Sequence, residues 1–304
     1  MPARNAGATI IESIESVLAL PQTSELIVID DCSNDLTREM VSEIKDSRVR
    51  LIGGNGTGIA AALNCGFEAA RSEFVARCDA DDLYPADRFD WQLEWLRRNP
   101  DFIAISGGFQ SLTDKGRPVA LLACDGIGRE VTMSLRRGRA ITTFCSWLVR
   151  RSALSAIGGA RGWFETAEDL DLMFRAAYHG RVWHEPRVAY RYRLHDTSMT
   201  HSTGNNRRVF FERMAAAFAA QRGLDGTDDL ERGCPPEMLN IEEQPKKSAD
   251  QIEGQLIGAI WSNWNLGRRR DAISKSLESL RLRPLSGAIW RAFAVLMLKY
   301  LARR

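Results

Sequence analysis

Three carboxylates follow one short apolar run of this sequence. Asp79, Asp81 and Asp82 come directly after residues 73–78, a run whose composition predicts a buried β-strand. Open α/β sheets bind their ligands at the carboxyl ends of strands. Carboxylates this close repel one another, so they are either solvated at a surface turn or gathered around a cation. The Asp-x-Asp spacing alone leaves both interpretations open, and the second would be a Mg²⁺ or Mn²⁺ site that also uses substrate phosphates.

Two further strand–turn–helix units precede this acidic segment. A β-branched run over residues 24–31 predicts a strand that ends in a polar turn and enters a helix near Thr37. Residues 48–52 predict the next strand, which is followed by a Gly-rich loop over residues 53–58 and by a helix of small residues from Ile59. The repeated order of strand, loop and helix predicts an α/β fold.

Five segments of the chain, taken in order, resemble the family 2 glycosyltransferases, whose catalytic domain has the GT-A fold. These segments are residues 2–5, 28–33, 58–64, 77–82 and 166–172. The resemblance covers residues 1 to about 205. It implies an α/β domain with an open, twisted mixed sheet flanked by helices, and it leaves a helical C-terminal extension outside that domain.

The resemblance implies a nucleotide-sugar donor whose base is uracil. The residues that it places at the nucleotide are Pro2, Ala3, Arg4, Asp31, Ser33, Gly58, Asp79 and Ala80. It also implies a divalent metal, Mn²⁺ or Mg²⁺, held by Asp81 and Asp79, which His195 can reach. Arg193, in the same closing segment as His195, is implied to approach the diphosphate.

The Gly-rich loop does not match the two best-known phosphate-binding motifs. A dinucleotide fingerprint beginning at Gly54 would need a third glycine where the chain has Ile59. A P-loop would need Lys and then Ser or Thr after Gly58, where the chain has Ile59 and Ala60. The loop is therefore either a flexible turn before a helix or a direct contact of the sugar nucleotide.

The catalytic residues implied by the family are the neighbouring acids Glu168 and Asp169. We expect them at the start of a helix, where the helix dipole and free N–H groups favour a carboxylate that is ready to accept a proton. Asp169 is the expected base, and Glu168 is expected to orient it or the acceptor. The alternative is that both acids, with Thr166 as N-cap, only cap the helix.

Two aromatic residues precede this acidic pair. Trp163 and Phe164 follow a Gly-rich stretch, residues 158–162, and aromatic faces suit sugar rings. They are therefore candidates for contact with the acceptor, and the alternative is that they anchor the hydrophobic core.

The expected reaction is an inverting transfer of a sugar to a hydroxyl of a glycan or of a lipid-linked acceptor in cell-surface polysaccharide synthesis. Two alternatives stay open. A nucleotidyltransferase shares the α/β layout and acidic metal sites, but residues 2–5 do not supply the Gly-rich basic loop that it would need. An inactive binding or scaffold protein with the same fold is opposed by the presence of Asp79, Asp81, Glu168 and Asp169.

The chain departs from the family at its beginning. The segment 2–5 normally follows a hydrophobic central strand, and this sequence starts at Met1 without it. Two neighbouring strands would then carry unpaired backbone groups, each costing about 1–3 kcal/mol if buried. We therefore expect either a wrongly assigned start or a truncated chain, with reduced nucleotide affinity and stability if the chain is complete.

With 304 residues, of which 44% are hydrophobic, the chain can form a full α/β core and an accessory part. The expected boundaries are a catalytic domain over residues 1–222, a linker over 223–250 and helices over 251–304, the latter expected as 252–282 and 286–304. The last helix is basic and amphipathic, so it either lies on an anionic membrane or packs on the preceding helix. The net charge of +2 does not indicate a nucleic-acid partner. Six cysteines without a C-x-x-C pair indicate a cytoplasmic protein. The basic helix allows peripheral contact with the cytoplasmic face of the inner membrane.

Overall fold

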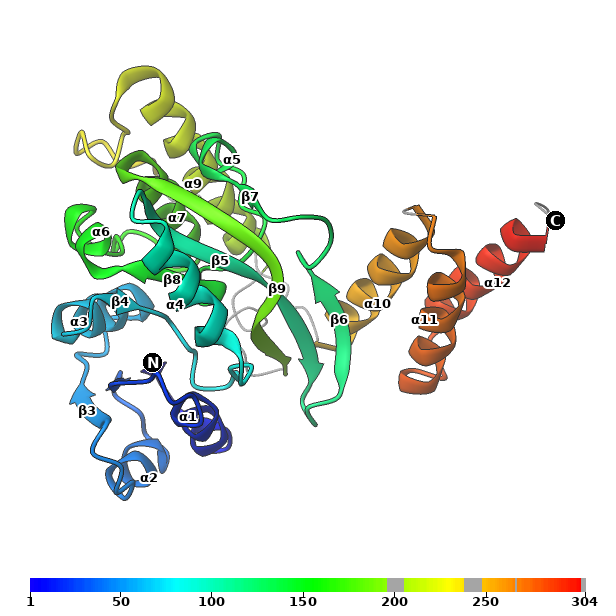
Figure 1. The fold of residues 1–304 in the computed structure, drawn as a ribbon, viewed down its shortest axis with the longest axis horizontal. Helices are drawn as coiled ribbons and strands as arrows, with labels where there is room; N and C mark the ends of the chain where they lie inside the picture. Colours follow the sequence, from blue (N-terminus) through cyan, green and yellow to red (C-terminus); the bar gives the residue numbers. More distant parts are fainter. Residues whose placement is uncertain (196–204, 238–247, 266, 302–304) are drawn as a thin grey trace. The chain divides into compact units, whose positions relative to one another are not determined.

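The computed structural model describes residues 1–195, 205–237, 248–265 and 267–301. The chain divides into two compact units (Figure 1). The first unit comprises Met1–Phe109, Leu122–Tyr192 and Asn206–Glu243, and the second comprises Gln110–Leu121, Arg193–Asn205 and Gln244–Arg304.

The first unit begins with a small parallel sheet. Its order is β1-β2-β3, with bounds Pro2–Ala3, Leu26–Asp30 and Val49–Gly53. All five residues of β2 are buried, because β2 is the middle strand. Met1 donates its terminal N–H to the carbonyl of Ile27 at 2.8 Å, and its own carbonyl accepts from Ile29. Pro2 and Ala3, expected in a loop after an absent strand, thus form the short strand β1.

Three helices cover this small sheet. They are α1 (Ile10–Leu18), α2 (Thr37–Ser42) and α3 (Ile59–Ala69). The starts of α2 at Thr37 and of α3 at Ile59 confirm the two predicted strand–turn–helix units. Apolar residues at helical spacing on α1, Ile10, Ile14 and Val17, bury against β2.

A second, six-stranded sheet forms the rest of the α/β core. Its order is β4-β8-β5-β9-β7, and β6 pairs with β5. The strand bounds are Phe74–Val75 (β4), Phe102–Thr113 (β5), Pro118–Leu122 (β6), Arg129–Glu130 (β7), Trp147–Arg150 (β8) and Arg181–Leu194 (β9). β8 runs antiparallel to both β4 and β5. Of the strand predicted over residues 73–78, only Phe74 and Val75 form β4, because only these two residues pair with β8.

Within the first unit, side chains join the small sheet to residues that follow β4 and to β9. Among the described residues, β1 pairs with β2 and β4 pairs with β8, and no ladder links β1 to β4. Instead, the hydroxyls of Thr9 and Ser13 both donate to the carbonyl of Ala80, at 2.9 and 3.0 Å. Cys78 and Tyr190 pack in the same apolar cluster as α1. We call this junction the seam.

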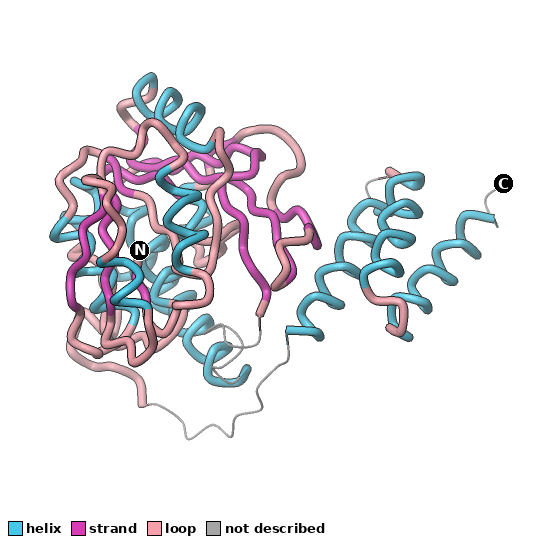
Figure 2. Tube along the Cα trace, turned by 90° about the horizontal axis from the view of Figure 1, so that it is seen from below, coloured by secondary structure: helices cyan, strands magenta, loops and turns pink. Residues whose placement is uncertain are grey.

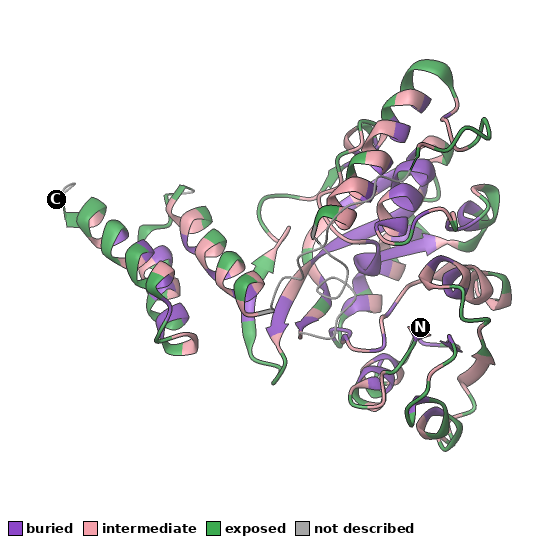
Figure 3. Ribbon diagram, turned by 180° about the vertical axis from the view of Figure 1, so that it is seen from behind, coloured by how far each residue is buried: buried purple, intermediate pink, exposed green. Residues whose placement is uncertain are grey.

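Helices and a large apolar cluster stabilise the second sheet. The helices are α4 (Arg88–Arg98), α5 (Thr132–Arg136), α6 (Arg151–Ala156), α7 (Glu168–His179) and α9 (Asn205–Asp225). Figure 3 shows that buried residues concentrate on the strands and on one side of these helices. The largest cluster combines Trp147 of β8 with Phe174 of α7 and Phe211 and Phe218 of α9.

Three helices make up most of the second unit (Figure 2). They are α10 (Ser248–Asn265), α11 (Arg269–Leu282) and α12 (Gly287–Leu301). The prediction of one continuous helix over residues 252–282 is wrong, because the backbone turns at Gly267 with φ of +78°. A φ in this region is readily adopted by glycine and ends a helix. Residues 238–247 of the predicted linker lie outside the described residues.

The amphipathic helix predicted at the C-terminal end is present as α12. Ile289, Ala292 and Leu296 are buried, and Leu296 packs with Ile260 of α10 and with α11. Trp290, Leu298 and Leu301 remain exposed. Packing on the preceding helices is thus observed, while contact with a membrane stays a prediction. Among the described helices, none is both long enough and apolar enough to cross a bilayer.

Candidate active site

The segments that follow the carboxyl ends of β1 and β2 lie side by side, because hydrogen bonds join them. The N–H of Asn5 donates to Ser33 Oγ at 3.0 Å, and the side-chain oxygen of Asn5 accepts from the N–H of Asn34 at 2.9 Å. The N–H of Gly7 donates to Asp35 Oδ2. The residues predicted at the nucleotide from positions 2–4 and from Ser33 therefore lie together, with Arg4 exposed.

Asp31 holds the Gly-rich loop in place. Its side chain is only 4% exposed, and its carboxylate accepts the N–H groups of Gly56 at 2.8 Å and Gly58 at 3.2 Å. A Cβ on Gly54 would lie 2.7 Å from Asp31 Oδ1, so the loop needs glycine there. Gly58 has φ of +102° and is the N-cap residue of α3. The predicted contacts of Asp31 and Gly58 with the nucleotide stay predictions.

The Asp79–Ala80–Asp81 segment lies directly against both sheets. The N–H of Asp79 donates to the Tyr190 hydroxyl of β9 at 3.0 Å, and α1 binds the Ala80 carbonyl at the seam. Leu83 exchanges two backbone hydrogen bonds with Arg191. These contacts fix the acidic segment at the carboxyl end of β4, as the sequence predicts.

Arg77 connects the acidic segment to the predicted catalytic acids. Its Nε donates to Asp79 Oδ1 at 2.6 Å and its Nη2 to Asp79 Oδ2 at 3.2 Å, while its Nη1 donates to Glu168 Oε1 at 2.9 Å. The Cys145 thiol also donates to Asp79 Oδ2, at 3.4 Å. The pKa of Arg77 is raised well above its ordinary value by Asp79 and Glu168, against the effect of burial. We call Arg77, Asp79 and Glu168 the arginine bridge.

Glu168 and Asp169 open α7, as predicted. The residue before them, Ala167, adopts the left-handed region with φ of +60° and makes no side-chain cap, so the alternative that Thr166 caps the helix is wrong. Asp169 is half-buried, and its Oδ1 accepts the N–H of Leu170 at 2.9 Å. One carboxylate oxygen of Asp169 thus bonds to the helix start.

Burial raises the pKa of Glu168 from 4.5 to about 7, with Asp169 adding to the rise and Arg77 opposing it. Between pH 4.5 and about 7, Glu168 is protonated in the folded protein and ionised in the unfolded chain. The free energy of unfolding should therefore fall as the pH rises through this range. Urea unfolding at several pH values should show that the free energy of unfolding falls less steeply with pH in Glu168→Gln than in the wild-type protein. Equal slopes for the two proteins would contradict this pKa.

Asp81, a predicted metal ligand, and its neighbour Asp82 differ in exposure. Asp81 is half-exposed at the end of the segment, whereas Asp82 is 1% exposed. Within the residues that the structure describes, no group of three metal-ligating side chains converges on one point. Mg²⁺ commonly uses only one or two carboxylates and takes its other ligands from phosphates and water, so the predicted metal at Asp81 stays a prediction.

The two aromatic residues predicted at the acceptor belong to an aromatic cluster. Phe164 is 2% exposed, so its proposed contact with the acceptor is wrong and the core alternative holds. Trp163 is half-buried and packs edge-on against Phe211 of α9, with ring centroids 5.3 Å apart. A contact between Trp163 and an acceptor stays a prediction.

Arg193 and His195 belong to the second unit. Arg193 is 6% exposed and donates from Nη1 to the carbonyl of Asp114 at 2.9 Å, within the same unit. His195 follows the end of β9 and is half-buried. Their predicted contacts with the diphosphate and the metal stay predictions.

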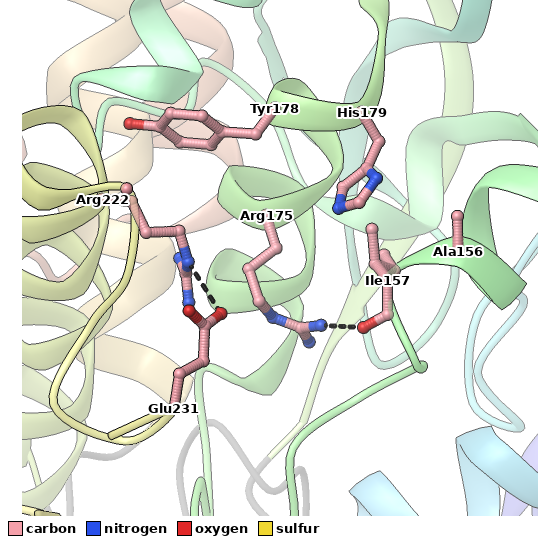
Figure 4. Close-up of a pocket in the computed structure, with 8 residues that line it drawn as sticks. Ala156, Ile157, Arg175, Tyr178, His179, Arg222 and Glu231 are labelled. Atoms are coloured by element: carbon pink, nitrogen blue, oxygen red, sulfur yellow. Dashed lines mark hydrogen bonds and ion pairs between the residues drawn. The ribbon is translucent and has the colours of Figure 1, made fainter.

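A cavity of about 300 Å³ lies at the other end of α7 (Figure 4). Arg175 and Arg222 point into this region, where Arg175 donates to the Ile157 carbonyl and Arg222 to Glu231. Arg175 is seven positions beyond Glu168, which is about 10 Å along a helix axis. None of the predicted site residues lines this cavity, and we assign its arginines a structural role.

Arg77, Tyr190 and Cys145 contact Asp79, and none of these three contacts was predicted from the sequence. For Arg77 a signal was present, because an arginine within an otherwise apolar strand run needs a buried acidic partner. Its partner Glu168 lies 91 positions away, which no local pattern reveals.

Comparison with known proteins agrees with this architecture. The model of the family described as glycosyl transferase family 2 matches residues 1–158. The UDP-Glc:alpha-D-GlcNAc-diphosphoundecaprenol beta-1,3-glucosyltransferase WfgD of Escherichia coli is 39% identical over 101 residues, 33% of this chain and 40% of that protein. The succinoglycan biosynthesis protein ExoO of Rhizobium meliloti is 43% identical over 94 residues, 30% of this chain and 27% of that protein. The matched regions thus span less than half of these relatives.

Solved structures share the fold. S. aureus TarS 1–349 in complex with UDP-GlcNAc superposes with a TM-score of 0.59 at 15% identity, over 100% of this chain and 90% of that one. The predicted GT-A architecture, a mixed sheet flanked by helices with further helices at the C-terminal end, is confirmed. Because the family model matches more than half of the 304 residues, the chain belongs to glycosyl transferase family 2.

Proposed function

We propose that this protein transfers a sugar, with inversion, from a UDP-sugar to a hydroxyl of a glycan or lipid-linked acceptor in cell-surface polysaccharide synthesis. The observation that carries the proposal is the arginine bridge, which places the start of α7 beside the Asp79–Asp81 segment. The names of WfgD and ExoO, and the UDP-GlcNAc in the TarS complex, support the donor and pathway class.

The reaction needs a base for the acceptor hydroxyl and stabilisation of the departing diphosphate. Asp169, half-exposed at the start of α7, is the proposed base. Asp81 would hold Mn²⁺ or Mg²⁺, and such an ion would neutralise charge on the leaving group. The surface formed by the ends of β1 and β2, including Asp31 and Ser33, would bind uracil and ribose.

The test is UDP release and sugar transfer from a panel of UDP-sugars, with and without Mn²⁺ or Mg²⁺. We expect turnover that depends on the metal and that falls about 100-fold or more in Asp81→Asn. Asp87→Asn is the matched control, because Asp87 lies six residues further on, is 57% exposed and pairs only with Arg187 among the bonds described. It should keep wild-type turnover.

Absence of turnover and of UDP-sugar binding in the folded wild-type protein would overturn the proposal and favour a scaffold role. Turnover that is unaffected by metal or by Asp81→Asn would retain the transferase but reject the proposed role of Asp81.

A further inference from the structure

Arg77 is the only residue described that bonds both to the acidic segment after β4 and to the acids at the start of α7. We propose that Arg77 is a positioning residue, which fixes Glu168 and with it the first turn of α7, so that Asp169 is held at the donor site. Asp79 then serves as the anchor of Arg77 and leaves the metal to Asp81. This inference rests on the proposed function and adds a residue to it.

The geometry of the bridge is specific to a guanidinium group. Two nitrogens of Arg77 face the two oxygens of Asp79, and the third nitrogen faces Glu168. The three side chains are 10%, 26% and 7% exposed, so water competes little for these bonds. A planar fork can serve two carboxylates at fixed directions, whereas an ammonium group acts as a single point of charge.

The charges also require the bridge. Without Arg77, Asp79 would lose its guanidinium partner, and Glu168 would lose the cation that opposes the rise of its pKa by burial and by Asp169. The Cys145 thiol and the Tyr190 hydroxyl, the other groups at Asp79, carry no positive charge. Arg77 therefore links the start of α7 to an acidic segment that other contacts hold in place.

The effect on the reaction should be on the chemical step. Asp169 follows Glu168 directly on α7, so a shift of Glu168 displaces the base. A displacement of about 1 Å at a reacting group can cost about 100-fold in rate. The surface that would bind uracil and ribose is held by other hydrogen bonds, which involve Asn5, Ser33 and Asp31 and do not involve Arg77.

The experiment is steady-state transfer kinetics of Arg77→Met and Arg77→Lys with the UDP-sugar and metal that the wild-type protein accepts. We expect kcat to fall about 100-fold in Arg77→Met, with the donor KM changing much less. Arg77→Lys should recover only part of the loss. Arg150→Met, on strand β8, is the matched control. Like Arg77, Arg150 uses three guanidinium nitrogens, but it donates to Glu73 and to the carbonyls of Phe102 and Leu96, not to the acids of the site.

A double-mutant cycle separates positioning from general damage. If Arg77 acts through Glu168, Arg77→Met combined with Glu168→Gln should be no slower than the slower single variant. Thermal unfolding confirms that each variant is folded, and Arg77→Lys carries the cycle if Arg77→Met does not fold.

Three results would overturn the inference: a kcat within twofold of wild type, strictly additive losses in the cycle, or a loss confined to the donor KM. The last would make Arg77 a donor-binding residue. Each is distinct from failure of the proposed function, which would show as a wild-type protein without turnover.

Discussion

Replacing Asp169 by Asn should lower kcat for sugar transfer by about 10²–10⁴-fold, the usual contribution of a general base. The amide oxygen can still accept the N–H of Leu170, as the carboxylate does at 2.9 Å, so the start of α7 should be preserved. An amide cannot take the proton of the acceptor hydroxyl. Transfer kinetics with saturating acceptor, together with UDP affinity by calorimetry, should show a lost kcat and an unchanged affinity.

Glu165→Gln provides the control for this substitution. Glu165 lies four residues earlier, is 43% exposed, and pairs with Arg207 of α9. The same change of carboxylate to amide should leave kcat within about twofold, as expected for an exposed pair. If Asp169→Asn retains most of its activity and Glu168→Gln loses it, the base is Glu168 and not Asp169.

Removing Arg161 should cause the largest loss of stability in the first unit. Arg161 donates from Nε to Asp171 Oδ2 at 2.9 Å and from Nη1 to Asp228 Oδ2 at 2.9 Å, and both aspartates are fully buried. Arg175 and Arg222 complete the network. Arg161→Met leaves two buried carboxylates short of a partner, which costs about 3–5 kcal/mol. For a unit of this size the Tm should fall by about 6–20 °C.

Arg98→Met is the comparison for this effect. Arg98 and Glu94 form an ion pair on α4 whose side chains are 75% and 58% exposed. Exposed pairs contribute about 1 kcal/mol or less, so the Tm should barely move. Calorimetry of both variants tests the contrast, and similar Tm values for Arg161→Met and Arg98→Met would show that the buried network adds no stability.

The repeating strand and helix units could be predicted because they depend on local patterns. The β-branched run of β2, the start of α2 at Thr37 and the start of α7 at Glu168 follow from periodicity and family resemblance. The length of β4 could not be predicted in this way. A strand exists only where a neighbouring backbone pairs with it, and residues 76–78 have no such neighbour among the described strands.

The candidate site was predicted as a set of residues but not as a set of bonds. The sequence indicates Asp79 and Glu168, yet their shared partner Arg77 depends on packing between segments far apart in the chain. Likewise, the aromatic side chain of Phe164 suits a contact with a sugar, but the residue is buried in the core. The break of the C-terminal helix at Gly267 needs only one residue in the left-handed region, and most glycines within helical patterns do not mark such a break.

The seam has a consequence for how donor selectivity could change. A backbone ladder fixes neighbouring strands about 4.8 Å apart, whatever the side chains are. At the seam, the spacing between the ends of β1 and β2 and the Asp79–Asp81 segment depends on the rotamers of Thr9 and Ser13 at the Ala80 carbonyl. Single substitutions at these two positions should therefore change the span that the diphosphate of the proposed donor would bridge, while every hydrogen-bonded ladder stays intact.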